Sequence, residues 1–441
     1  MKRGRWVLAG GATAALLAAT AVPALANTQK NVTLVVAEWT NPPAIKVTQL
    51  IDQKFEKLHP GVTIDLQYAP TAQGAWHTLF NTLLQSKRVD VLAQFAPGDF
   101  VPPSYMNESL NALQTLESTH QLMDLKHFPF MKYFIPGIQA GAAGINGGIY
   151  GAEMARYGNT GVFYNKTMFA KYHLSVPKTW NQFMHVCAVL QKHNITPLYV
   201  AGQSNMEGMV FNAIMNAQFP RANTTKLEYQ LDNAFWHKKT SWNSPVWKKI
   251  MTRYQQASKY FEPNWSGVAQ LNAPGQWAAS SSAAMLVDGS WDGWTVKTAN
   301  PKLNFGWFPI PGSNKVKNNK LFVANDLTWV IPTWAPQVNL AIQYLSFFSQ
   351  PANYRLWENY VGSLPTERVS SNLPWMTTEN QFVRQRRTQT GMSIAMPKNP
   401  PPLANFTGDE SQLSPIGQYS VTELQKLATQ QFQAAAIPSG S

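Results

Sequence analysis

The start of the chain alternates between short apolar runs and a stretch with helical periodicity. Residues 32–37 form a β-rich run, and the apolar side chains within 47–58 fall on one face of a helix. The segment 59–61 contains Pro and Gly and ends that helix, and residues 62–68 then alternate between apolar and polar. A further strand follows at 89–93. This order predicts a parallel βαβ unit with a right-handed crossover, and hence an α/β lobe.

The same alternation begins again near Thr160. Residues 161–164 and 283–287 predict strands, and Thr179 with a glutamine three residues later predicts a capping box at a helix start. Later patterns predict one strand and two helices, at 327–331, 338–348 and 421–432. A chain of this length exceeds what one hydrophobic core usually holds, so we expect two lobes.

The N-terminus has the pattern of a secretory signal peptide. Lys2, Arg3 and Arg5 precede the apolar stretch Trp6–Val22, and the small-residue pattern Pro23–Ala26 follows. A membrane anchor is the alternative, but the apolar part is short and rich in alanine. No later segment has 18 consecutive apolar residues, and the leader has no cysteine for lipid attachment. We therefore expect an exported, soluble protein of the periplasm or the cell exterior.

Composition excludes several classes of protein. The single cysteine, Cys187, rules out a disulfide framework and a cysteine-cluster metal site, and its apolar setting predicts an inert core thiol. The formal charge of +13 falls to +10 without the three basic leader residues. The basic residues are dispersed, so we expect no nucleic acid partner.

The low content of charged residues, 13%, suggests an acidic growth medium. A chain with few carboxylates loses little stability when carboxylates become protonated. Compositional drift explains the same numbers equally well.

Three segments resemble the family 1 extracellular solute-binding proteins, the sugar receptors of ABC importers that include maltose-binding protein. Tyr164–Phe183 is similar to the family's YNK…PKTW segment, and Ala283–Trp294 to its A-M-x-x-x-G-x-W turn. Ala341–Gln350 followed by Gly362–Pro365 resembles the late helix and closing G-x-x-P. The three segments occur in the family's order and extend over most of the chain.

The resemblance implies an α/β, two-lobed type II periplasmic-binding-protein fold with a hinged cleft between the lobes. It divides the chain into a signal peptide (1–26), an N-lobe (27–158 and 309–350) and a C-lobe (159–308 and 351–441). It implies a carbohydrate ligand, the permease subunits of an ABC importer as partners, a monomer, and no cofactor, metal or catalysis.

A sugar offers hydroxyl groups and flat C–H faces, so its receptor needs aromatic platforms and oriented polar groups. The chain has 16 tryptophans and 15 tyrosines, several of them just after strands, where open α/β sheets bind ligands. Trp39, with Glu38 before it, follows the first strand, and Asp99 follows the strand at 89–93. Packing of the turn and a solvated loop or helix cap are their alternative roles.

The resemblance points most directly to Trp291, which stands where the family has a stacking tryptophan, with Asp288 as a weaker candidate. Asn325 and Asp326 precede the late N-lobe strand, where the family often has two glycines. Their longer side chains leave it open whether they contact the ligand or only support the strand.

Five further candidates have packing or surface roles as equal alternatives. Tyr157 stands just before the first crossing, Gln203 and Glu207 lie in a polar loop, and Trp265 and Trp277 flank a Gly/Pro/Ser-rich loop.

Two other functions remain open at this point. A secreted glycoside hydrolase would use the same aromatic platforms with two carboxylates. A binding protein for a polyamine, a phosphorylated polyol or a metal is the second, although the 8 histidines show no metal-ligand spacing.

Overall fold

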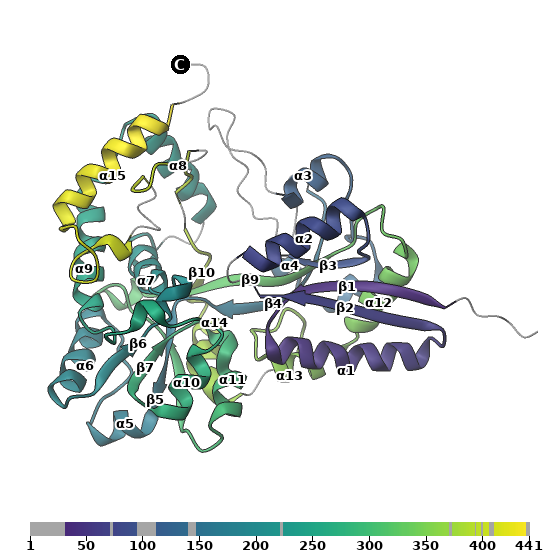
Figure 1. Cartoon of the computed structure of the whole chain (residues 1–441), viewed down its shortest axis with the longest axis horizontal. Coiled ribbons are helices and arrows are strands. Elements are labelled where there is room, and N and C mark those ends of the chain that lie inside the picture. The colour runs from purple at the N-terminus through teal and green to yellow at the C-terminus, as the bar shows by residue number, and fades with distance from the viewer. Residues whose placement is uncertain are drawn as a thin grey trace, which may run out of the picture.

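The computed structural model of the chain has an α/β architecture with one sheet in each half of the molecule (Figure 1). The structure describes residues 31–70, 74–94, 112–139, 147–220, 224–369, 373–392, 394–397, 400–404 and 410–437. Among these residues, no helix is both long enough and apolar enough to cross a membrane.

The first sheet contains the predicted βαβ unit. Its strands are β1 (Val32–Trp39), β2 (Val62–Ala69), β3 (Val91–Gln94), β4 (Ala152–Gly158), β9 (Leu321–Val330) and β10 (Thr388–Gln389). The order is β10-β9-β3-β1-β2, and β4 pairs with β9 outside this order. β1 is parallel to β2 and β3, whereas β9 runs antiparallel to β3 and β4.

The second sheet lies in the other half of the molecule (Figure 1). Its strands, in spatial order, are β6 (Thr196–Tyr199), β7 (Ala283–Val287), β5 (Gly161–Asn165) and β8 (Phe305–Pro309). β5 is antiparallel to both of its neighbours, and β6 is parallel to β7.

Helices surround both sheets. Near the first sheet are α1 (Pro42–Leu58), α2 (Ala75–Ser86), α3 (Ala112–Ser118), α4 (Pro136–Gln139), α12 (Val338–Phe348) and α13 (Pro351–Val361). With the second sheet are α5 (Lys166–Lys171), α6 (Trp180–Lys192), α7 (Gly208–Gln218), α8 (Thr224–Trp236), α9 (Pro245–Ser258), α10 (Ala273–Ser280), α11 (Gly293–Ala299), α14 (Thr377–Arg384) and α15 (Val421–Ala435). Figure 1 shows α1 and α13 on one side of the first sheet and α2 and α3 on the other.

The helix starts follow the local sequence. The Asn41 side chain accepts a hydrogen bond from the Ala44 amide at 3.3 Å, and Pro42 begins α1. Thr179 caps α6 as predicted, with 3.3 Å between its hydroxyl oxygen and the Gln182 amide nitrogen. The capping box is incomplete, because the Gln182 side chain accepts from Lys178 instead of Thr179.

Two hydrophobic cores divide the chain between the two halves. The first core holds buried residues from Leu34 to Tyr157 and from Leu327 to Val361. The second core holds buried residues from Val162 to Val323 and from Leu364 to Ala436, including Cys187. Burial raises the pKa of the Cys187 thiol, and the prediction of a core thiol is confirmed.

Helix α13 packs with the first half of the molecule, whereas the resemblance assigned residues 351–441 to the C-lobe. Tyr354, Trp357 and Val361 of α13 are buried in the first core, and the Tyr354 hydroxyl donates to the Met154 carbonyl at 2.9 Å. The apolar face of α13 lies against α1, which explains why this helix stays with the first half of the molecule. By the membership of the cores, we propose that the chain crosses between 158 and 162, between 323 and 327, and between 361 and 364.

Glycines at the first crossing make room for an indole ring. Trp307 is buried, and its ring nitrogen donates to the Asp288 carbonyl at 3.0 Å. A Cβ atom added to Gly161 would lie 2.0 Å from Cζ2 of Trp307 and 2.8 Å from the Phe308 carbonyl oxygen. A side chain at this position is therefore incompatible with the present packing.

Four carboxyl groups lie buried in and around the first core. Burial raises the pKa of Glu38 to about 8, with the neighbouring Asp52 adding to the effect. Burial also raises the pKa of Asp52 and of Asp326 to about 7, and that of Glu153 well above 4.5. The folded state thus binds these protons more tightly than the unfolded chain does.

We predict that Gly161→Ala lowers the free energy of unfolding by about 1–3 kcal/mol, because the new methyl group overlaps the Trp307 ring. Urea unfolding of both proteins measures the difference. Gly137→Ala is the matched control, since a Cβ there has no atom within 4 Å, and it should leave stability unchanged or slightly raised. Equal stability of Gly161→Ala and the parent would contradict this account.

We also predict that the protein is more stable at about pH 5 than at about pH 8. As the pH rises, the unfolded carboxyls ionise first, so stability is lost progressively until the folded pKa of about 8 is passed at Glu38. The free energies of unfolding from urea titrations at the two pH values should differ by an amount on the order of several kcal/mol.

The variant Glu38→Gln should reduce this pH dependence, because a neutral isostere has no proton to lose. Asp65→Asn, on the exposed side of β2, should retain the parental dependence. Stability that stays constant or rises from about pH 5 to about pH 8 would refute the raised pKa values of these carboxyls. It would also refute the hypothesis of an acidic growth medium.

Candidate ligand-binding site

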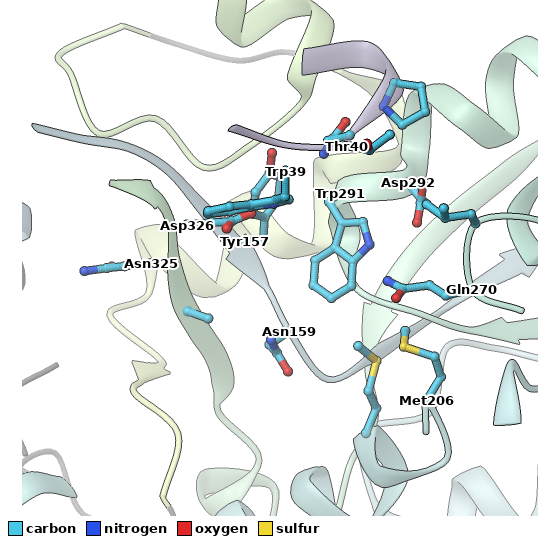
Figure 2. A pocket seen from close by; sticks show the side chains of 15 residues that line it. Trp39, Thr40, Tyr157, Asn159, Met206, Gln270, Trp291, Asp292, Asn325 and Asp326 are labelled. Atoms are coloured by element: carbon cyan, nitrogen blue, oxygen red, sulfur yellow. The ribbon is translucent and has the colours of Figure 1, made fainter. Parts of the chain in front are cut away.

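A cavity of about 390 Å³ lies between the two cores (Figure 2). It is lined by Trp39, Thr40, Asn41, Pro42, Tyr157, Asn159, Met206, Met209, Gln270, Leu271, Trp291, Asp292, Ala324, Asn325 and Asp326. These residues come from distant parts of the sequence and from both halves of the molecule.

The end of β1 supplies one aromatic wall. Trp39 is the last residue of β1, and the turn that follows leads directly into α1. The Trp39 ring packs edge-on against Trp76, with 5.8 Å between centroids and 70° between planes. The carboxyl end of a parallel strand is where open α/β sheets place ligands, which is the position that the sequence predicted for Trp39.

The pairing of β4 with β9 supplies the floor. Tyr157 is opposite Ala324, and Arg156 is opposite Asn325. The Asp326 amide donates to a Glu153 carboxylate oxygen at 3.0 Å. The next residue, Leu327, has a φ of 51°, an uncommon conformation for a residue with a side chain, and its amide donates to Asp326 Oδ1. This change in backbone direction at Leu327 comes directly after Asn325 and Asp326, the two polar residues that line the cavity.

Tyr157 has an unsatisfied hydroxyl group. The side chain is 1% exposed, and its hydroxyl has no hydrogen-bond partner among the described residues. Burial, together with the nearby Asp326 and Asp292 carboxyls, raises the pKa of Tyr157 well above 10, so the hydroxyl stays protonated and can donate. A buried polar group of this kind is stabilised when a ligand supplies the partner.

The second half of the molecule supplies the opposite wall. Trp291 and Asp292 lie in a short 3₁₀ turn, Ser290–Asp292, just after β7. The Trp291 ring packs against both cores and meets the Tyr157 ring edge-on, with centroids 5.9 Å apart at 88°. Figure 2 shows Trp291, Asp292, Gln270 and Met206 across the cavity from Asn325 and Asp326.

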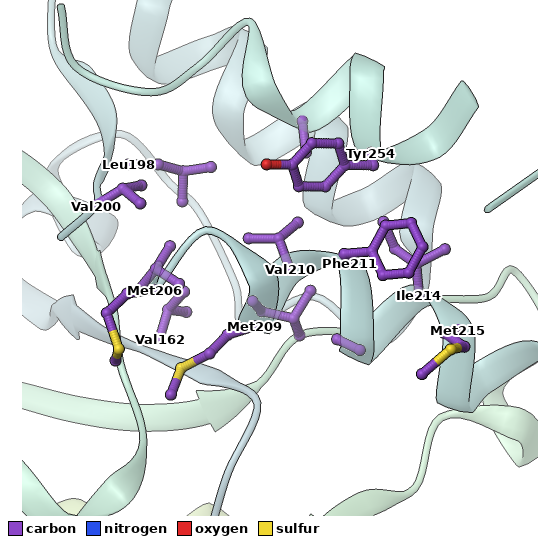
Figure 3. Packing of buried hydrophobic residues seen from close by; sticks show 14 of the residues in the cluster. Val162, Leu198, Val200, Met206, Met209, Val210, Phe211, Ile214, Met215 and Tyr254 are labelled. Carbon is purple, nitrogen blue, oxygen red and sulfur yellow. The ribbon is translucent and has the colours of Figure 1, made fainter. Parts of the chain in front are cut away.

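Two methionines belong to both the cavity and the second core. Met206 and Met209 line the cavity and pack with Val162, Val200 and Val210 beneath it (Figure 3). Their flexible, polarisable side chains form an adaptable apolar surface.

Two carboxyl groups line the cavity, Asp326 from the floor and Asp292 from the opposite wall. Burial raises the pKa of Asp326 to about 7 and that of Asp292 to about 6. Asp288 lies behind Asp292. Burial, together with the charge of Asp292, raises the pKa of Asp288 well above its ordinary value. Among the described residues that line the cavity, none is lysine or arginine.

Five predicted site residues line this cavity: Trp39, Tyr157, Trp291, Asn325 and Asp326. Ligand contact by each of them stays a prediction. Asp99 lies outside the described residues.

Two predicted residues lie behind the cavity walls. Glu38 precedes Trp39 on β1, and successive side chains of a strand point to opposite faces, so Glu38 points away and is buried near Thr48 and Asp52. Asp288 is also buried, and its carboxylate accepts from the Gly289 amide at 2.8 Å. Both residues support the wall and do not line it.

Four further predicted site residues, Gln203, Glu207, Trp265 and Trp277, do not line this cavity. Trp277 is a core residue whose ring nitrogen donates to the Ala283 carbonyl at 2.9 Å. Trp265 packs against Gly202, and Glu207 is buried at the start of α7. Gln203 lies in the same loop, where its amide binds the Val268 carbonyl. The loop approaches the cavity, but Met206 is the residue that reaches it.

Several lining residues were missed. Asp292 directly follows Trp291, Asn159 lies two residues after Tyr157, and Thr40 to Pro42 form the turn after Trp39. Met206, Met209, Gln270 and Leu271 carry no local signal, because only the tertiary fold brings them to the cavity. No group of His, Cys, Asp or Glu suited to a metal ion occurs in the described part of the chain.

Known proteins with similar sequences bind solutes. The chain is 26% identical over 198 residues to the multiple sugar-binding protein of Streptococcus mutans, an alignment covering 43% of this chain and 45% of that protein. It is 23% identical to an uncharacterized ABC transporter extracellular-binding protein of Pyrococcus horikoshii, covering 65% of this chain and 62% of that protein. The chain thus spans about half to two thirds of these curated relatives.

A solved structure shows the fold. SBP RafE in complex with raffinose superimposes with a TM-score of 0.72 at 19% identity, covering 91% of this chain and 99% of that one. The predicted two-lobed α/β fold is thereby confirmed. The family described as bacterial extracellular solute-binding protein matches residues 42–355, and it consists of binding proteins and not enzymes, which removes the glycoside hydrolase alternative. This chain belongs to the family of bacterial extracellular solute-binding proteins.

Proposed function

We propose that the protein captures a sugar or oligosaccharide between its two lobes and delivers it to the permease of an ABC importer. The observation that carries this proposal is the cavity between the cores, in which Trp39 and Trp291 provide aromatic faces beside the polar groups of Asn325, Asp326 and Asp292.

The chemistry of the lining matches a neutral polyol ring. Indole faces cover the C–H patches of a sugar, while amides and carboxyls bind its hydroxyls. The pKa values of Asp292 and Asp326, about 6 and about 7, allow both carboxyls to donate as well as accept in mildly acidic medium. The absence of lysine and arginine from the described lining disfavours a phosphorylated polyol.

The relatives support the same ligand class. One is named for binding multiple sugars, and the solved structure of RafE contains raffinose. The name of the other relative supports an ABC importer as partner. Together with the leader pattern of residues 1–26, the family supports export to the periplasm or the cell exterior.

The mechanism follows from two half-sites. Each lobe alone leaves its half of the cavity open to water, and a ligand touches both walls only when the lobes are close together. The ligand therefore stabilises the closed arrangement by its difference in affinity for the two states. We propose that the permease recognises this closed arrangement and that the sugar leaves unchanged.

A thermal-shift screen identifies the ligand class. The panel contains neutral mono-, di- and trisaccharides including raffinose, together with glycerol 3-phosphate and spermidine. A ligand at 100 times its Kd stabilises the folded state by about 2.7 kcal/mol, which gives a measurable rise in Tm. If spermidine alone raises Tm, the ligand is a cation bound at Asp292 and Asp326 and not a sugar. If none of the neutral sugars raises Tm, the proposal is overturned.

We predict that Trp291→Ala weakens sugar binding by about 10- to 100-fold, because the stacking platform and its contact with Tyr157 are lost together. Isothermal titration calorimetry with the best ligand of the screen measures the effect. Trp265→Ala is the matched control, since it removes a partly buried indole of the same lobe that lies outside the cavity. Retained affinity in Trp291→Ala would remove this residue from the site.

We further predict that a saturating sugar lowers the radius of gyration, because it draws the lobes together. Small-angle scattering with and without ligand measures this change. At the lowest sugar concentration that saturates the parent, the Trp291→Ala protein should stay closer to the larger value. An unchanged radius in the parent would contradict lobe closure.

A further inference from the structure

A buried carboxylate outside the cavity joins the two structural parts that form the cavity. Glu379 lies on α14 and is fully buried. Its Oε1 atom accepts from the Gly158 amide at 2.7 Å and from the Ser290 hydroxyl at 2.8 Å. The Gly158 amide lies 3.0 Å from the Ser290 oxygen as well, so the three groups form a closed triangle.

Each partner of Glu379 is the sequence neighbour of residues that line the cavity. Gly158 lies between Tyr157 and Asn159, at the first crossing between the cores. Ser290 immediately precedes Trp291, in the turn after β7. A single carboxylate thus connects backbone from the first sheet to the turn of the second lobe that carries the aromatic platform.

The surroundings leave this triangle little freedom. A Cβ atom on Gly158 would lie 2.6 Å from the Trp307 ring and 2.9 Å from Glu379 Oε1, so the crossing packs tightly between them. The Trp291 ring lies over the backbone of Gly289, since a Cβ atom added to Gly289 would lie 2.0 Å from the Trp291 ring. The ring direction of Trp291 therefore follows the position of the turn, and the turn is held by Ser290.

We propose that Glu379 is a positioning residue for the ligand site, which it serves without touching the ligand. Its two hydrogen bonds hold the crossing and the turn at a fixed separation, so that the Tyr157 and Trp291 rings are already arranged when the sugar arrives. A pre-arranged site binds more tightly because less conformational freedom is lost on binding. The effect on affinity rests on the proposed function, whereas the arrangement of the rings does not.

The variants separate positioning from general stability. Glu379→Ala removes both hydrogen bonds and should weaken sugar binding about 10-fold or more. Glu379→Gln retains an acceptor oxygen and should restore affinity to within about threefold of the parent. Ser290→Ala removes both contacts of the Ser290 hydroxyl, the one to Glu379 and the one to the Gly158 amide. Its loss of affinity should not add to that of Glu379→Ala in the double variant.

Asp90→Ala is the matched control. Asp90 is also a buried carboxylate that joins two segments, since it accepts from the Val35 amide at 2.9 Å and from the Gln337 amide at 2.6 Å. These bonds lie in the first core and away from the cavity lining. The variant should lose stability but keep its affinity within about twofold.

A spectroscopic measurement tests the positioning itself. In protein labelled with 5-fluorotryptophan, the ¹⁹F resonance of Trp291 is identified by its absence from Trp291→Phe. It should shift or broaden without ligand in Glu379→Ala and in Ser290→Ala, and remain at the parental position in Glu379→Gln and Asp90→Ala. If Glu379→Ala does not fold, Ser290→Ala provides the same test.

The possible failures are distinguishable. A parent protein that binds no sugar overturns the proposed function, while the fluorine spectra still decide on Glu379. The positioning role is overturned by an unchanged Trp291 resonance in Glu379→Ala and Ser290→Ala, by parental affinity in both, or by an equal loss of affinity in Asp90→Ala.

Discussion

The antiparallel pairing of β4 with β9 is the interaction on which the site depends. It extends from Ala152 opposite Trp329 to Gly158 opposite Val323, and it spans the region where the chain passes between the two cores. The two strands form one ladder, and buried side chains bind two of its amides, since Glu379 accepts from Gly158 and Glu153 accepts from Asp326. The same ladder places Tyr157, Asn325 and Asp326 at the base of the cavity, so the connection between the lobes and the binding surface are one structure.

The abundance of tryptophan proved to be a property of the cores more than of the site. Most of the largest fully buried side chains are indoles, among them Trp236, Trp242 and Trp329. Among the tryptophans that the structure describes, only Trp39 and Trp291 line the cavity. What distinguished these two in the sequence was position, directly after a strand or in a turn of known type, and not residue type. Trp265 and Trp277, chosen from loop composition, had no such positional support.

The periodicity of the chain predicted the βαβ start, the helices and the strand-end location of Trp39, because these follow from local backbone geometry. The choice between Glu38 and Trp39 also lay within reach, since neighbours on a strand face opposite sides. Residues such as Met206 and Gln270 were beyond reach, because only the packing of the loops before α7 and before α10 brings them to the cavity. The packing of α13 with the first half of the molecule was beyond reach for a similar reason, since its partner α1 lies some 300 residues earlier in the sequence.

The late position of β9 in the sequence has a consequence for biosynthesis. β3 and β4 both need β9 as a neighbour, yet β9 begins only at Leu321, well after the whole second sheet has been made. An emerging chain therefore presents an incomplete first sheet with an open edge until some three quarters of its length has been synthesised. Pairing across such a sequence separation is slow, so the ladder that forms the base of the cavity is completed late in folding.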